Sequence, residues 1–227
     1  MRPSAFLFDL DGTLLDTERL WAVAIRDYLA DRGATTTAGR ILEIVFGRSW
    51  FDIHKSLVAH FPQAADPVPA TMAADLRPYY LRQIEDPARL MIPPSVETLK
   101  RLARLAPVAI VSGSPRRDVE AAVDLMDARD AVAFVLGAED YPRGKPAPDG
   151  YLAAARRLNV PPESCVVFED SPIGVRAAKA AGMFCVALDR TGTCTAELRQ
   201  TADLLLTQLD RLPPVETLIP DPPEKHP

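Results

Sequence analysis

The sequence predicts an α/β protein: a doubly wound parallel sheet with a small all-helical domain inserted after the first strand. Five short apolar runs do not alternate with polar residues, which is typical of strands buried on both faces. Helical patterns separate the last four runs, and the stretch 16–90 after the first run is too long for a single crossover. The five runs cover residues 5–10, 108–113, 133–138, 165–170 and 184–189.

Helical segments and one further strand complete the expected core. A strand, a helix and a second parallel strand form a right-handed crossover, so helices should cover both faces of a Rossmann-like sheet. A sixth apolar run, 202–207, is expected at an edge of the sheet. The core domain should comprise 1–15 and 91–212, followed by a flexible, proline-rich tail over 213–227. The core helices are expected over 115–127, 148–158 and 172–181.

The stretch 16–90 has the patterning of a helical domain. Apolar residues from Leu20 to Leu29 recur at helical spacing, and Gly33 follows as a C-terminal stop signal. We expect Trp21 to belong to the core of this domain. Further helices are predicted over 37–47, 49–61 and 70–86.

Composition limits the classes of partner. The net charge of −5 argues against a nucleic-acid or anionic-membrane surface. No apolar run approaches the ~20 residues that a membrane helix needs, and residues 1–8 do not have the pattern of a secretory leader. We therefore expect a cytoplasmic protein, a monomer, without a nucleic-acid or membrane partner. The cysteines, Cys165, Cys185 and Cys194, lack CxxC spacing and are interpreted as buried apolar residues in a reducing compartment.

Polar residues gather where the predicted strands end. Asp9 and Asp11 close the first strand, residues 112–114 (Ser-Gly-Ser) the second, and 169–171 (Glu-Asp-Ser) the fourth. Lys145 stands in a separate loop before the 148–158 helix. Ligands of parallel α/β sheets bind at the carboxyl ends of the strands, so these side chains should meet at one edge.

These residue types fit phosphoryl transfer. Clustered carboxylates of Asp9, Asp11 and Asp170 suit Mg²⁺, and Lys145 can hold a phosphoryl oxygen. Ser114-Pro115 and Ser171-Pro172 have the pattern of a helix N-cap followed by proline, which would direct backbone N–H groups toward an anion. Of the two neighbouring acids, we assign the nucleophilic attack to Asp9 and the proton transfer to Asp11.

Four motifs resemble the haloacid dehalogenase (HAD) superfamily of phosphohydrolases, in particular its sugar-phosphate phosphatase and β-phosphoglucomutase-like subgroup. They are "DLDGTLLDTE", "VSGS", "GKPAPDGY" and "FEDSPIGVRAAKAAGM", in the family's order. The resemblance implies an aspartyl-phosphate on Asp9 and a helical cap over 16–90 that sets substrate choice.

The resemblance also implies a role for each remaining position. Asp11 would be the general acid/base and give a backbone carbonyl to Mg²⁺, while Ser112, with Gly113, and Lys145 would hold the phosphoryl group. Asp170 would ligate Mg²⁺, with Glu169 supporting either the metal or the lysine. The substrate would be a small phosphorylated metabolite, such as a sugar phosphate or a phosphoglycolate-like monoester.

Two alternatives to a phosphatase stay open at this point. A β-phosphoglucomutase-like enzyme needs cap cations for a second phosphate; Trp50 stands where such relatives carry an arginine, although Arg48 and Lys55 could compensate. Trp50 itself could line the substrate pocket or the cap core. A receiver-type signalling domain shares the Asp, Mg²⁺ and Lys but needs neither this cap nor Asp11. Haloacid dehalogenation works without a set of metal ligands, so the presence of Asp11 and Asp170 argues against that activity.

Overall fold

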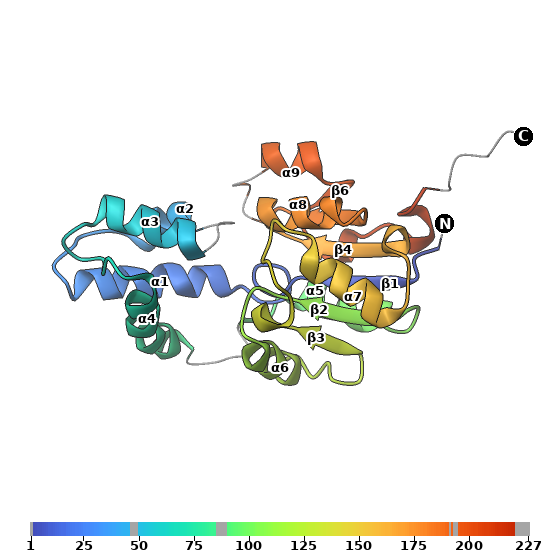
Figure 1. The fold of residues 1–227 in the computed structure, drawn as a ribbon, viewed down its shortest axis with the longest axis horizontal. Coiled ribbons are helices and arrows are strands. Elements are labelled where there is room, and N and C mark those ends of the chain that lie inside the picture. The colour runs from blue at the N-terminus through green and yellow to red at the C-terminus, as the bar shows by residue number, and fades with distance from the viewer. Residues whose placement is uncertain (1, 46–49, 85–89, 191, 193–194, 221–227) are drawn as a thin grey trace, which may run out of the picture. The chain divides into compact units, whose positions relative to one another are not determined.

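A computed structural model describes residues 2–45, 50–84, 90–190, 192 and 195–220. One of its two compact units, 1–15 with 91–227, is built on a six-stranded, wholly parallel sheet in the order β3-β2-β1-β4-β5-β6 (Figure 1). This architecture confirms the predicted doubly wound, Rossmann-like sheet, including its sixth strand. The strands are β1 (Ala5–Phe8), β2 (Val108–Val111), β3 (Phe134–Leu136), β4 (Cys165–Glu169), β5 (Phe184–Leu188) and β6 (Leu204–Leu206).

Helices cover both faces of the sheet. On one face, α7 (Asp149–Leu158), α8 (Pro172–Ala180) and α9 (Thr195–Thr201) share a core with inward residues of the strands, among them Leu7 and Val167. Because parallel crossovers are right-handed, α5 (Pro93–Leu102) and α6 (Arg116–Leu125) lie on the other face. Every residue of β1, β2 and β4 is buried, which explains why these strands show no polar alternation.

Two helices of the core were not predicted. Helix α5 begins with Pro93 and Pro94, which are favourable in a first helical turn but are usually signs of a loop. Helix α9 has only seven residues, too few for a clear periodicity.

The prediction of a flexible tail over 213–227 is wrong for its first part. Residues 215–217 form a short 3₁₀ helix, η5 (Val215–Thr217), and Val215, Leu218 and Ile219 are buried. These apolar side chains gain free energy by leaving water, which holds the segment against the core. Residues 221–227 lie outside the described part of the chain.

Residues 16–90 form a second compact unit, made of α1 (Thr17–Ala30), α2 (Ala38–Val45), α3 (Trp50–His60) and α4 (Pro69–Gln83). Its own core contains Ile25, Tyr28 and Leu57. The predicted stop after α1 is confirmed: Gly33 has φ +85°, and the Ala34 N–H donates to the Leu29 carbonyl at 3.0 Å. A Cβ at such a positive φ would be strained.

Trp21 and Trp50 both pack on this helical core. Trp21 stacks on Tyr80 with ring centroids 4.2 Å apart, and Trp50 is half-buried at the start of α3. The stacking of Trp21 on Tyr80 agrees with the expectation that Trp21 belongs to the core of this unit. Arg48, which could supply a cation to this unit, lies outside the described residues.

Cys165 and Cys185 are buried, free thiols in β4 and β5, whereas Cys194 lies outside the described residues. Burial raises the pKa of Cys165 to about 12 and that of Cys185 well above its usual range. We expect a thiol reagent at about pH 8 to leave both unmodified in the native protein, because the thiolate is the reactive form. Peptide mapping by mass spectrometry, with a guanidinium-unfolded sample as the control, checks this. Rapid native labelling of Cys165 would contradict it.

Among the described helices, none is long and apolar enough to cross a membrane.

Candidate active site

The end of β1 places two carboxylates at the carboxyl edge of the sheet. Asp9 is the first residue after the strand, and its N–H donates to the Phe168 carbonyl of β4 at 3.0 Å. Its side chain is almost fully buried, while Asp11 is half-buried. Between Asp11 and the following turn, Gly12 has φ +89°, and a Cβ there would lie 1.9 Å from Asp170 Oδ2. Only glycine therefore lets β1 turn this close to Asp170.

Lys145 connects three segments of the core. Its Nζ donates to Asp9 Oδ1 and, at 2.6 Å, to Glu169 Oε1, although these residues are 136 and 24 positions away in the sequence. The same nitrogen approaches the Val111 carbonyl at the end of β2, at 3.3 Å. The Lys145 side chain is 11% exposed and that of Glu169 0%, so this is a desolvated ion-pair cluster rather than a surface pair.

Two serine hydroxyls after β2 converge on Asp11. Ser112 Oγ donates to Asp11 Oδ2 at 3.1 Å, and Ser114 Oγ donates to the same oxygen at 2.8 Å. The Ser114 N–H in turn donates to Ser112 Oγ at 3.0 Å, across Gly113. Asp11 and the 112–114 loop thus form one hydrogen-bonded unit at the edge of the sheet.

The predicted Ser114 cap is wrong, whereas the predicted Ser171 cap is confirmed. Helix α6 begins at Arg116 with Pro115 as its N-cap residue and no side-chain cap, because the Ser114 hydroxyl is used on Asp11. The Arg116 N–H donates instead to Glu139. At α8, Ser171 Oγ accepts from the Gly174 N–H at 3.1 Å, and Pro172 occupies the first turn.

The charges of the cluster favour a bound cation. Burial raises the pKa of Asp9 well above its ordinary value, and the Lys145 ammonium opposes that rise. Burial disfavours the charge of Lys145, but the carboxylates of Asp9 and Glu169 outweigh it and raise the lysine pKa. One carboxylate oxygen from each of Asp9, Glu169 and Asp170 lies within 4.8 Å of the others. Three clustered, buried carboxylates, two of which contact the Lys145 ammonium, offer hard oxygen donors that fit a divalent cation such as Mg²⁺.

Comparison with known proteins gives the family. A model of haloacid dehalogenase-like hydrolases matches residues 3–182, more than half of the chain. The chain belongs to this family. Its relatives include the validoxylamine A 7′-phosphate phosphatase of Streptomyces hygroscopicus subsp. limoneus, 35% identical over 209 residues that cover 89% of this chain and 92% of that protein.

Two further comparisons agree with this family. The fructose-1-phosphate phosphatase YqaB of Escherichia coli (strain K12) is 32% identical, over 80% of this chain and 94% of the relative. A solved structure from Thermotoga maritima with a provisional β-phosphoglucomutase name superimposes with a TM-score of 0.69 at 25% identity, covering 91% of this chain and 95% of the other.

The structure of this HAD-like hydrolase brings together most of the predicted site residues. Asp9, Asp11, Ser112, Lys145 and the 169–170 pair all lie at the carboxyl edge of the core sheet. Trp50 belongs to the other compact unit, so its proposed contact with a substrate stays a prediction.

Two polar contacts of the site went unnoticed in the sequence. Ser114 was interpreted as a helix cap, yet its hydroxyl contacts Asp11. Tyr151, the last residue of "GKPAPDGY", donates its hydroxyl to Glu169 Oε1 at 2.9 Å. A signal for the tyrosine existed, because it lies three residues into a helix that directly follows the Lys145 loop.

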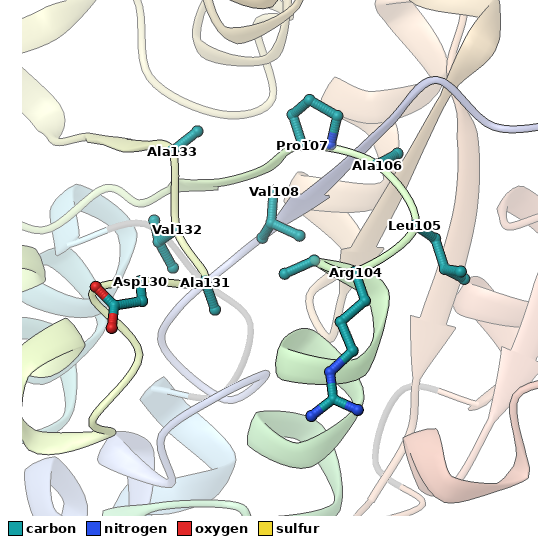
Figure 2. A pocket seen from close by; sticks show the side chains of 10 residues that line it. Arg104, Leu105, Ala106, Pro107, Val108, Asp130, Ala131, Val132 and Ala133 are labelled. Atoms are coloured by element: carbon teal, nitrogen blue, oxygen red, sulfur yellow. The ribbon is translucent and has the colours of Figure 1, made fainter.

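Figure 2 shows the residues that line a surface hollow, which has a volume of about 440 Å³. Residues 103–108 and 130–133, which line it, precede or begin β2 and β3. It therefore belongs to the amino ends of the strands, away from the carboxylates. Its rim offers suitable positions for control substitutions.

Proposed function

We propose that this HAD-like hydrolase is a Mg²⁺-dependent phosphatase that hydrolyses small phosphomonoesters through an aspartyl-phosphate on Asp9. The direct contact of Asp9 with Lys145, beside Glu169 and Asp170, carries the proposal. A buried nucleophile next to a cation, with oxygen ligands for a metal, is the set of parts that phosphoryl transfer needs. Two relatives are named as phosphatases of validoxylamine A 7′-phosphate and of fructose 1-phosphate, which supports a phosphomonoester as the substrate.

The chemistry divides between the two aspartates. A carboxylate oxygen of Asp9 attacks phosphorus, the bond from phosphorus to the leaving oxygen breaks, and Asp11 donates a proton to that oxygen. A water molecule then attacks the phosphorus of the aspartyl-phosphate and gives its proton to Asp11, which releases inorganic phosphate and restores Asp9. Lys145, Ser112 and the N–H groups around Gly113 hold the phosphoryl oxygens during both steps.

Asp9, Asp170 and the backbone carbonyl of Asp11 are the residues that would hold Mg²⁺, while Glu169 holds Lys145. The ion, when bound, neutralises phosphoryl charge and keeps Asp9 ionised despite its burial. The helical unit 16–90 serves in this proposal as a cap that excludes bulk water and selects the substrate, with Trp50 as a candidate contact to a sugar face.

A phosphate-release screen tests the proposal. The purified protein with Mg²⁺ should release inorganic phosphate from at least one of a panel of hexose phosphates, hexitol phosphates and phosphoglycolate. EDTA should abolish the release by removing the cation that balances the carboxylates, and re-addition of Mg²⁺ should restore it. Undiminished turnover in EDTA would contradict the metal dependence, and no release from any monoester would contradict the function.

A β-phosphoglucomutase-like activity is the second candidate, favoured by the solved structure from Thermotoga maritima. A mutase must hold a second phosphate, for which Trp50 offers no charge. Incubation with β-glucose 1-phosphate and its 1,6-bisphosphate separates the two activities. Glucose 6-phosphate forming faster than free phosphate would favour the mutase, and the reverse order would favour the phosphatase.

A further inference from the structure

The Glu169 carboxylate is surrounded by donors from the protein itself. Its Oε1 accepts from Lys145 Nζ at 2.6 Å and from the Tyr151 hydroxyl at 2.9 Å. Its Oε2 accepts from the N–H groups of Asp170 and Ser171, at 3.0 and 3.1 Å, and from Ser171 Oγ at 2.9 Å. Both oxygens are thus engaged, and the side chain is completely buried. A carboxylate with this many fixed donors is held in one orientation.

Gly174 leaves the space in which this carboxylate lies. A Cβ at position 174 would come within 1.8 Å of Glu169 Oε1, so only glycine allows the first turn of α8 to pack on Glu169. The same turn is capped by Ser171, whose hydroxyl also contacts the carboxylate. The start of α8 and the end of β4 therefore together fix the position of the Glu169 carboxylate.

Tyr151 contacts both members of the Lys145–Glu169 pair. Besides the hydrogen bond to Glu169, Lys145 Nζ lies over its ring, 5.2 Å from the ring centroid, within the range of a cation–π contact. The ring is 1% exposed and packs in the core under the sheet. Burial and the neighbouring Glu169 carboxylate raise the pKa of Tyr151 well above its usual value, which keeps the hydroxyl protonated as a donor.

We infer that Tyr151 is a positioning residue: it fixes Glu169 so that this carboxylate orients Lys145 toward Asp9, instead of turning toward the metal. The inference rests on the proposed function. If the tyrosine hydroxyl is removed, Glu169 Oε1 loses one of its two donors and retains only Lys145. The oxygen then attracts the ammonium more strongly and draws it away from Asp9. Lys145 would then neutralise the phosphoryl group less well, although the groups that would bind the metal, Asp9 and Asp170, are unchanged.

The first test is Tyr151→Phe, which removes the hydroxyl and keeps the ring. We expect kcat to fall about 10- to 100-fold. The Mg²⁺ concentration for half-maximal activity should change by less than about threefold, because Glu169 is not directed at the metal. The matched control is Tyr28→Phe, since Tyr28 is also a buried tyrosine but belongs to the core of the separate helical unit 16–90. An unchanged kcat in Tyr151→Phe, or a large loss of Mg²⁺ affinity, would overturn the inference.

A double-mutant cycle with Glu169→Gln tests whether Tyr151 acts through Glu169. In the Glu169→Gln background, Tyr151→Phe should lower kcat by no more than about twofold, since the two residues form one unit. Additive effects of the two substitutions would show that Tyr151 acts independently and would overturn the inference.

An activity-independent measurement separates this inference from the proposed function. The ¹⁵N resonance of the Lys145 ammonium, assigned by its absence in Lys145→Met, should shift in Tyr151→Phe and stay unchanged in Tyr28→Phe. If no substrate is hydrolysed but the resonance shifts, the function fails and the positioning contact stands. If phosphate is released and the resonance does not move, the positioning role fails and the function stands.

Discussion

Asp9→Asn is expected to lower kcat for phosphate release by about 10⁴-fold or more, because an amide cannot replace the attacking carboxylate. The amide oxygen can still accept from Lys145, which also keeps its 2.6 Å contact with Glu169. The melting temperature should therefore stay within about 4 °C of the parent protein. Steady-state phosphate release and a thermal melt, on the substrate found in the screen, provide the two measurements.

Asp130→Asn is the matched control for this substitution. Asp130 is exposed at the hollow beside the amino ends of β2 and β3, at the other edge of the sheet from Asp9. The same change of charge there should leave kcat within about twofold of the parent value. Full activity of Asp9→Asn would contradict the aspartyl-phosphate mechanism, and an equal loss in both variants would indicate an effect of net charge.

Lys145→Met should impair both turnover and stability. It leaves Asp9 and Glu169 buried without the ammonium that they share, and breaking such a pair costs about 3–5 kcal/mol of unfolding free energy. We expect kcat to fall by about 10³-fold, since the charge on the phosphoryl oxygens also loses its partner. Urea unfolding in EDTA, followed by circular dichroism, measures the stability term without a contribution from Mg²⁺.

Lys179→Met is the control for Lys145→Met, because it removes an exposed lysine from an ion pair instead of a buried one. Lys179 pairs with Asp203 at 2.6 Å, but its side chain is 37% exposed, and such surface pairs contribute about 0–1 kcal/mol. A stability loss in Lys145→Met no larger than that in Lys179→Met would show that the Asp9–Lys145–Glu169 cluster is not a coupled buried unit.

Local patterns in the sequence were sufficient for the sheet and for the chemistry at its edge. Apolar runs without alternation predicted all six strands. The reason is clearest for β1, β2 and β4, which are buried throughout and therefore have no polar face. Polar residues at the ends of three of these runs predicted where the carboxylates, the serines and Asp170 would meet. The pattern at Ser171-Pro172 also predicted its cap correctly, since a cap is a contact within four residues.

Partners that are distant in the sequence required the tertiary structure. The Ser114 hydroxyl contacts Asp11 instead of capping α6, because the order of β1 and β2 in the sheet brings Asp11 within 2.8 Å of it. Likewise, the proline-rich composition of 213–220 predicted a flexible tail. In the structure, Val215, Leu218 and Ile219 are buried against a surface of the core. No local pattern encodes whether such a surface exists.

Residue type and short spacing were enough to predict the parallel core and the identity of the reactive groups around Asp9. The orientation of those groups depends on packing: Glu169 is held by Tyr151, Lys145 and the start of α8, from three separate segments. A buried carboxylate takes its direction from the donors that the packed elements bring to it, and short-range patterns in the chain do not specify those donors.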